Sequence, residues 1–262
     1  LTASDGSSTL HVALAWNDNS TETGYVVWRS TSAATNTAAA IWTNAANTTT
    51  YNDDTGAAGQ KYWYWVTATN DSGTSPFSAS NDGYRALSAP ANVAATDGTS
   101  TNSITVTWDA ATGATSYKLY RDTDSDPAGA TDLGAWTSGT ADSTVAPGQR
   151  YWYWVTALSS SSSSESAVGT ADYGYARLAT VGGVSASYDL YNTKIEVQWT
   201  DVGGETGYGI WRYTADTGAS AVFVGTAAAN ATNYPDTSAT PGTELYYWVR
   251  ATNGTSESQS DL

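Results

Sequence analysis

The chain has 262 residues, of which 40% are hydrophobic and only 13% are charged, so it has enough apolar side chains to build packed cores. Its 25 acidic and 10 basic residues give a net charge of -15, which repels nucleic acid phosphates and anionic lipid head groups. Cysteine is absent, which excludes disulfides and thiol chemistry, and no apolar run is long enough for a transmembrane helix. We therefore expect neither a nucleic acid partner nor membrane insertion.

The first strong strand pattern ends at Trp16 and recurs twice, ending at Trp108 and Trp199, with separations of 92 and 91 residues. In the second copy, Ile104 and Val106 alternate with threonines ahead of the tryptophan. Alternation with a period of two predicts strands that bury one face.

Two further segments follow each tryptophan in the same order. The first lies at residues 24–29, 116–121 and 207–212, and the second at residues 61–68, 150–157 and 245–251. Three landmarks that recur three times indicate three copies of one module. The short strands are separated by clusters of Gly, Asn, Asp and Ser, which is typical of an antiparallel β-sandwich.

Each copy resembles a fibronectin type III domain of the kind found in bacterial extracellular arrays. That family pairs a core tryptophan with a tyrosine on the next strand, as in Trp16 with Tyr25, Trp108 with Tyr117, and Trp199 with Tyr208. It also has a corner tyrosine shortly after a tight turn, matched by Tyr62 and Tyr151, whereas the third copy has Leu245 there. The resemblance implies an all-β chain of three tandem immunoglobulin-like (fibronectin type III) β-sandwiches, about seven strands each, in a secreted or cell-surface protein.

The repeat places the module boundaries at 1–86, 87–177 and 178–262. Linkers this short allow little independent tumbling, so we expect a semi-rigid rod. Leu1 is equivalent to Val93 and Val184, and Leu262 lies near the positions of Gly83 and Tyr173. We therefore expect the native polypeptide to continue on both sides.

The chain is poorly supplied for catalysis, because His11 is the one histidine and there is no cysteine. We expect it not to be an enzyme. Asp53, Asp142 and Asp236 fill the same position in every copy, just ahead of a turn. This pattern indicates aspartates that hydrogen-bond to the turn backbone rather than catalytic carboxylates.

A candidate metal site is the alternating acidic run of the second copy, Asp122, Asp124 and Asp126. Alternate carboxylates are able to converge on one calcium ion. However, Pro127 and Leu133 stand where a calcium loop of the helix–loop–helix type needs glycine and glutamate, and the other copies lack the run. A solvated acidic loop is the favoured interpretation, and no cofactor other than calcium is expected.

Alternation along the strands sends three large aromatic side chains per copy to one outward sheet face. They are Trp28, Trp63, Trp65, Tyr120, Trp152, Trp154, Trp211, Tyr246 and Trp248. Three interpretations stay open: stacking within the sheet with Lys61, Lys118 or Arg250 over the rings, contact with another copy or a neighbouring surface protein, and stacking on sugar rings.

Five N-glycosylation sequons lie in predicted loops, at Asn19, Asn47, Asn70, Asn230 and Asn253. The serine run at 159–164 is either a flexible loop or a carrier of O-linked sugar.

We therefore predict a non-catalytic structural or adhesive segment of a secreted or cell-surface repeat protein, such as a fibre or appendage subunit. Its expected partners are other copies of itself, neighbouring surface proteins and glycans. The alternative is a set of carbohydrate-binding or spacer modules from a secreted glycoside hydrolase. Both rest on analogy, because one sandwich fold supports many functions.

Overall fold

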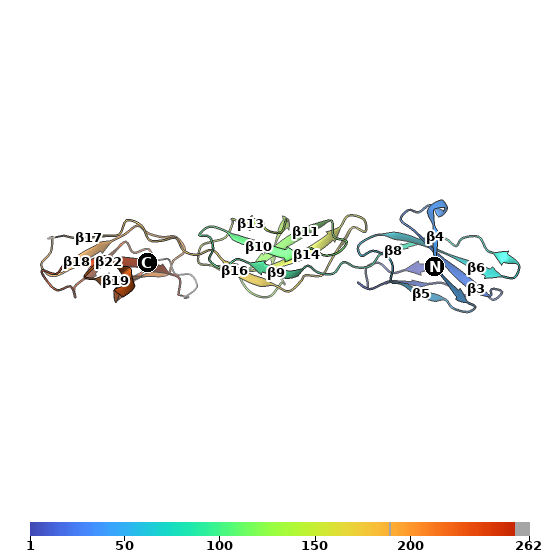
Figure 1. Cartoon of the computed structure of the whole chain (residues 1–262), viewed down its shortest axis with the longest axis horizontal. Helices are drawn as coiled ribbons and strands as arrows, with labels where there is room; N and C mark the ends of the chain where they lie inside the picture. Colours follow the sequence, from blue (N-terminus) through green and yellow to red (C-terminus); the bar gives the residue numbers. More distant parts are fainter. Residues whose placement is uncertain (189, 255–262) are drawn as a thin grey trace.

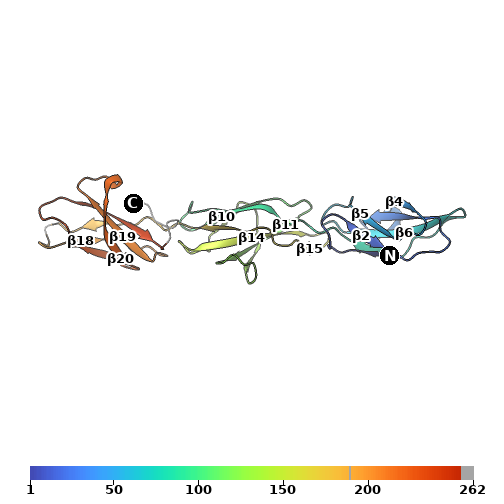
Figure 2. The ribbon, with the colours of Figure 1, turned by 90° about the horizontal axis from the view of Figure 1, so that it is seen from below.

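The computed structural model describes residues 1–188 and 190–254. Three β-sandwiches follow one another end to end and make an elongated molecule (Figure 1), and a second view at 90° shows the same linear arrangement (Figure 2). The predicted all-β sandwich class is confirmed, with two single-turn 3-10 helices, η1 (Thr35–Thr37) and η2 (Gly218–Ser220), as the helical elements among the described residues. In the described part of the chain, no helix has the length and apolarity needed to cross a membrane.

The N-terminal sandwich, unit 1, contains two antiparallel sheets. One sheet has the order β1 (Thr2–Ala3), β2 (Val12–Ala15), β5 (Thr50–Asp53). The other has the order β4 (Ala39–Ala45), β3 (Gly24–Ser30), β6 (Tyr62–Asn70), and β6 also pairs with β7 (Gly73–Thr74) and β8 (Asn81–Gly83).

Unit 2 repeats this arrangement. One sheet has the order β9 (Ala91–Ala95), β10 (Ile104–Asp109), β13 (Ala141–Asp142). The other has the order β12 (Thr131–Ala135), β11 (Ser116–Asp122), β14 (Arg150–Ser159), and β14 also pairs with β15 (Ser164–Glu165) and β16 (Asp172–Tyr175).

Unit 3 has two three-stranded sheets within the described residues. Their orders are β17 (Ser185–Ala186), β18 (Ile195–Gln198), β21 (Asn233–Asp236), and β20 (Val222–Ala228), β19 (Gly207–Tyr213), β22 (Tyr246–Thr252). The register of β19 with β22 matches that of β3 with β6 and of β11 with β14, so equivalent positions in the three units are fixed by strand pairing.

Each unit has its own core between its two sheets. In unit 2 the core contains Ile104 and Val106 from one sheet and Leu119, Tyr153 and Val155 from the other, all fully buried. The alternation predicted for the strands therefore holds on the inward face. The tryptophan–tyrosine pairs implied by the family resemblance are in contact in all three units, with ring centroids 5.7, 5.4 and 5.2 Å apart.

The corner tyrosines are present in two units, as the resemblance implies. The backbone N–H of Ala57 donates to Tyr62 Oη over 3.2 Å, and that of Ala146 donates to Tyr151 Oη over 3.2 Å. In unit 3 the equivalent residue, Leu245, has no hydroxyl to accept such a bond.

The joint between units 1 and 2 is made by a tight turn of unit 1 that packs on unit 2. Ser159 Oγ donates to the carbonyl oxygen of Gly59 over 2.6 Å, and Leu87 of the linker is buried beside that glycine. Gly113 lies so close to the carbonyl oxygen of Ala58 that a Cβ at this position would overlap it. Direct backbone contact therefore fixes one unit against the next.

The joint between units 2 and 3 uses equivalent positions. Asn253 Nδ2 donates to the carbonyl oxygen of Gly148, buried Leu178 takes the place of Leu87, and a Cβ at Gly204 would overlap the carbonyl oxygen of Pro147. Strand pairing shows that Ser159 and Asn253 are equivalent. Ser159 follows the residue that pairs with the first residue of β11, and Asn253 follows the residue that pairs with the first residue of β19. The same contact is thus formed twice by different side chains.

Candidate functional site

The outward aromatic face of unit 1 is covered by the chain itself. Phe77 packs edge-on against Trp28 and Trp65, with ring centroids 5.3 and 6.2 Å apart. Trp28 Nε1 also donates to Thr67 Oγ1 over 3.1 Å. Trp65 is only 3% exposed, so side chains of unit 1 cover this ring.

Unit 2 covers its face with different residues. Trp154 is also only 3% exposed. Tyr120 Oη donates to Glu165 Oε1 over 2.8 Å, and the ring of Trp152 lies 5.2 Å from that of Tyr173. Alternation along the strand correctly predicts the sheet face on which these side chains lie. It gives no information about which later segments of the chain cover that face.

Cations lie over two of these rings, as the local interpretation predicts. Lys61 Nζ lies 5.9 Å from the ring centroid of Trp63, and the guanidinium of Arg250 lies 5.4 Å from that of Trp211. Lys118 instead forms ion pairs with Asp132 and Glu165.

Among the described residues, the most exposed aromatic ring on the three faces is in unit 3. Trp211 packs against Phe223 with ring centroids 5.4 Å apart, and Trp248 is half-buried in register with Trp211. Tyr246 is 37% exposed and Phe223 is 54% exposed.

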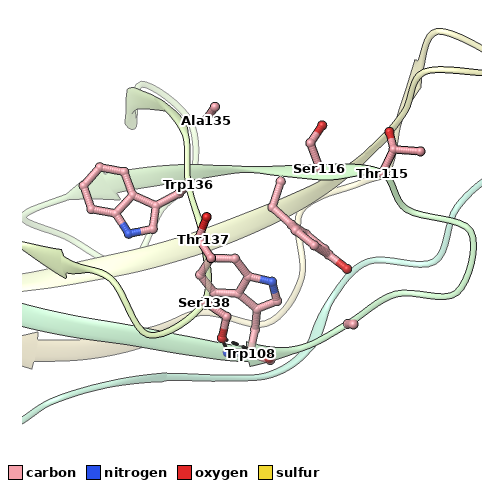
Figure 3. A pocket seen from close by; sticks show the side chains of 9 residues that line it. Trp108, Thr115, Ser116, Ala135, Trp136, Thr137 and Ser138 are labelled. Atoms are coloured by element: carbon pink, nitrogen blue, oxygen red, sulfur yellow. Dashed lines mark hydrogen bonds between the residues drawn. The ribbon is translucent and has the colours of Figure 1, made fainter.

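A pocket that sequence reasoning missed lies in unit 2 (Figure 3). Its volume is about 440 Å³, and its lining combines three aromatic rings with small hydroxyl residues. It is lined by Trp108, Ala110, Thr115, Ser116, Tyr117, Ala135, Trp136, Thr137 and Ser138. Trp136 follows β12 on a segment with no clear strand alternation, and its ring packs beside the core pair of Trp108 and Tyr117.

The carboxylates of the acidic run in unit 2 bond to the backbone of their own loop. Asp124 Oδ1 accepts the N–H of Asp126, and Asp126 Oδ1 accepts the N–H of Ala128, each over 2.9 Å, while Asp122 Oδ1 accepts the N–H of Thr123 over 2.6 Å. No group of three potential ligands occurs among the described residues. These carboxylates stabilise consecutive turns of an exposed loop.

Four of the five sequon asparagines are exposed, at Asn19, Asn47, Asn70 and Asn230. Asn253 differs, because it is half-buried and its side-chain nitrogen donates across the joint to Gly148. That nitrogen is the atom to which an N-linked sugar would be attached. Residue 255, the threonine of this sequon, lies outside the described residues.

The aspartate repeated in every unit is a buried ion-pair partner as well as a turn residue. Asp53 and Asp142 are 0% and 1% exposed, and their carboxylates lie 2.7 and 2.6 Å from Arg29 and Arg121. Asp236 pairs with Arg212 over 2.5 Å. The predicted turn bonds are also present, with Asp53 Oδ1 accepting the N–H of Thr55 over 3.0 Å and equivalent bonds in the other units.

A tyrosine completes each of these clusters. Tyr64 donates to Asp53 over 2.9 Å, Tyr153 donates to Asp142 over 3.0 Å, and Tyr247 donates to Asp236 over 2.8 Å. We call each set of arginine, aspartate and tyrosine a triad. Sequence comparison between the copies could have found the arginines, since one ends each of the segments at 24–29, 116–121 and 207–212.

The triads shift the pKa values of their members in opposite directions. Burial by itself would raise the pKa of Asp142, but hydrogen bonds from Thr144, Arg121 and Tyr153 outweigh burial and hold this pKa below its usual range. Burial and the Asp142 carboxylate raise the pKa of Tyr153 well above its ordinary value. At neutral pH each triad thus contains a charged pair and a neutral tyrosine, which stabilises the fold and offers no reactive group.

The chain is similar to several solved structures. The three fibronectin domains FN1–FN3 of chicken CNTN1 are 19% identical, covering 97% of this chain and 92% of theirs, with a TM-score of 0.30. A two fibronectin type III domain segment from chicken tenascin is 17% identical, covering 66% of this chain and 95% of its own, with a TM-score of 0.51. A Fn3-like protein from Clostridium thermocellum is 30% identical, covering 34% of this chain and 93% of its own, with a TM-score of 0.31.

No family model and no curated protein sequence matches the chain. The tenascin segment shares the tandem sandwich architecture described above, and at its level of identity it supports the fold alone. With the tryptophan–tyrosine pairs and the two corner tyrosines in place, the chain is an array of tandem β-sandwiches with the fibronectin type III-like fold.

Proposed function

We propose that the chain is a stiff, non-catalytic spacer segment of a secreted or cell-surface protein. The observation that carries this proposal is the joint, formed twice at equivalent positions with buried leucines and backbone contacts. Such a joint restricts rotation between units and holds whatever lies at the two ends at a fixed separation. Four exposed sequons and a surface with few charges favour an extracellular setting.

The test measures flexibility at the joint between units 1 and 2. Because the chain lacks cysteine, one cysteine introduced on an exposed position of each unit allows spin labels to be attached specifically. Double electron–electron resonance should give a narrow distance distribution for the parent chain. Gly113→Asn should broaden it, since asparagine tolerates positive φ but its Cβ would overlap the carbonyl oxygen of Ala58.

The matched control is Gly129→Asn in the same unit. Gly129 also has a positive φ, of 95°, but a Cβ there would meet no atom within 4 Å. This control should leave the distribution narrow. A broad distribution in the parent chain would refute the spacer function.

Glycan binding is a second candidate function, favoured by the pocket of unit 2. Trp136 is half-buried beside three residues with hydroxyl side chains, Thr137, Ser138 and Ser116, and aromatic rings with adjacent hydroxyls suit the faces and edges of sugar rings. A glycan array should then show binding that is lost in Trp136→Ala and retained in Tyr246→Ala. An array that is blank for the parent chain would eliminate this candidate.

A further inference from the structure

The two joints share the contact of the turn but differ in the linker beside it. In the joint between units 1 and 2, residues 88–90 follow the buried leucine, and β9 then begins with Ala91 paired to Asp109. In the joint between units 2 and 3, residues 179–184 follow the buried leucine before β17 begins. The second linker is therefore longer and less constrained by strand pairing.

The residues of the two linkers also differ in backbone freedom. Positions 90–92 are Pro-Ala-Asn in the first joint, and the equivalent positions 181–183 are Val-Gly-Gly in the second. The equivalence follows from the register of β9 with β10 and of β17 with β18. Proline fixes φ, whereas glycine has access to more of the φ/ψ space than any other residue. The two adjacent glycines thus leave the second linker freer to change direction.

A side-chain bridge braces the first linker and has no equivalent in the second. Asn92 Nδ2 donates to Asp109 Oδ2 over 2.7 Å, which ties the end of the first linker to the end of β10. Gly183 and Thr200 occupy these two positions in unit 3, so neither the amide nor the carboxylate is present there. Asn92 and Gly183 both have a positive φ, of 52° and 67°. The two linkers therefore turn in the same way, but only the first is braced by side chains.

A pocket of about 630 Å³ lies on the linker side of the joint between units 2 and 3. Its lining comes from the turn of unit 2, the linker and the loop after β18, at residues 146–147, 179–180, 182–183 and 200–204. A Cβ at Gly182 or Gly203 would meet no described atom within 4 Å. At the edge of the pocket, by contrast, a Cβ at Gly204 would overlap the carbonyl oxygen of Pro147. This joint is thus tightly packed at the turn and open at the linker.

We propose that the joint between units 2 and 3 is a hinge, at which unit 3 bends while the joint between units 1 and 2 stays fixed. The contact of Gly204 with Pro147 is the pivot, the linker glycines absorb the changes in φ and ψ, and the pocket provides the space. This proposal rests on the spacer function and adds one bending point to it. Because a small bend shortens an elongated molecule very little, the chain keeps its spacing while the direction of unit 3 changes.

Spin-label pairs at equivalent positions compare the two joints directly. Ala15→Cys with Thr107→Cys spans the first joint, and Thr107→Cys with Gln198→Cys spans the second. The three residues are exposed and lie on the corresponding strands β2, β10 and β18. We expect the distance distribution across the second joint to be roughly twice as wide as that across the first, because a glycine linker is flexible.

Copying the first linker into the second joint should remove this difference. The triple variant is Gly182→Ala, Gly183→Asn and Thr200→Asp. It gives the second joint the residues that unit 2 has at the equivalent positions, and it should narrow the second distribution to the width of the first. The reciprocal variant, Ala91→Gly with Asn92→Gly, should widen the first distribution.

Gly203→Ala is the matched control for the triple variant. Gly203 also lines the pocket, and a Cβ there would meet no described atom within 4 Å, but the substitution leaves the linker unchanged. It should leave the second distribution wide. Melting curves verify that every variant is folded.

The two widths separate the hinge from the spacer function on which it rests. Equal widths across the two joints of the parent chain, or a triple variant as wide as Gly203→Ala, would overturn the hinge. If both joints give narrow distributions, only the hinge fails. If the joint between units 1 and 2 is also broad, the spacer function fails as well.

Discussion

Arg121 Nη1 lies 2.6 Å from the carboxylate of Asp142, and this ion pair is shielded from solvent on the aspartate side. Removing one partner of a buried pair leaves the other charge desolvated and uncompensated, which costs roughly 3–5 kcal/mol. We therefore expect Arg121→Met to lower the free energy of unfolding of unit 2 by about 3 kcal/mol, measured by urea denaturation. Lys118→Met is the control, because Lys118 makes exposed ion pairs with Asp132 and Glu165. An equal loss in the two variants would contradict the assigned role of the triad.

The stability of the array should fall on acidification because of its buried aspartates. The pKa values of Asp53, Asp142 and Asp236 are held below the ordinary value by the hydrogen bonds that outweigh burial. A carboxyl group whose pKa is lower in the folded state than in the unfolded state stabilises the folded state at pH values above its unfolded-state pKa. This stabilisation is lost as the pH falls through the folded-state pKa. Stability should thus be flat near neutral pH and decrease below about pH 4.

Urea denaturation at a series of pH values measures this dependence. Asp236→Asn should reduce the decrease below about pH 4, because it removes one of the three buried aspartates that take up a proton on unfolding. Asp124→Asn removes the same charge from an exposed loop and is the control. If the acid dependence is unchanged in Asp236→Asn, the triads do not determine it.

Unit 3 should become more stable when it is given a corner tyrosine. Leu245 occupies the position of Tyr62 and Tyr151, whose hydroxyls accept backbone N–H groups and whose rings lie 4.5 and 4.7 Å from an arginine. Arg212 occupies the equivalent position in unit 3, where its guanidinium would lie over a tyrosine ring at residue 245. Leu245→Tyr should raise the free energy of unfolding by about 1 kcal/mol. Leu245→Phe, which supplies the ring without the hydroxyl, should give a smaller gain, and a loss in both variants would contradict the prediction.

Glycosylation should distinguish Asn253 from the sequons at Asn47 and Asn230. In a glycosylating host, peptide mass spectrometry should find sugar at exposed sites such as Asn47 and Asn230. Asn253 should stay unmodified in the folded chain, because its side-chain nitrogen bonds to Gly148 across the joint. Gly204→Asn, which opens that joint, should increase the occupancy of Asn253, and full occupancy in the parent chain would contradict the joint geometry.

Repetition made much of this fold predictable. Residues that recur at the same place in three copies, such as Trp16, Trp108 and Trp199, identify the module, and alternation along strands identifies Tyr64 and Tyr153 as inward-facing. These signals are local, since they depend on the period of a strand and on the spacing of turns. They placed the strands, the core pairs and the corner tyrosines without reference to distant parts of the chain.

The tertiary structure decided what covers each surface, because coverage depends on residues that are distant in sequence. Phe77 packs against the rings of Trp28 and Trp65, Arg29 forms a buried ion pair with the turn residue Asp53, and Trp136 lines a pocket with Trp108. The glycines of the joints are likewise not identifiable from the local sequence. Nothing in the local sequence distinguishes Gly113 from Gly129. The packing of one unit on the next places a carbonyl oxygen where a Cβ of Gly113 would lie, whereas the space beside Gly129 is open.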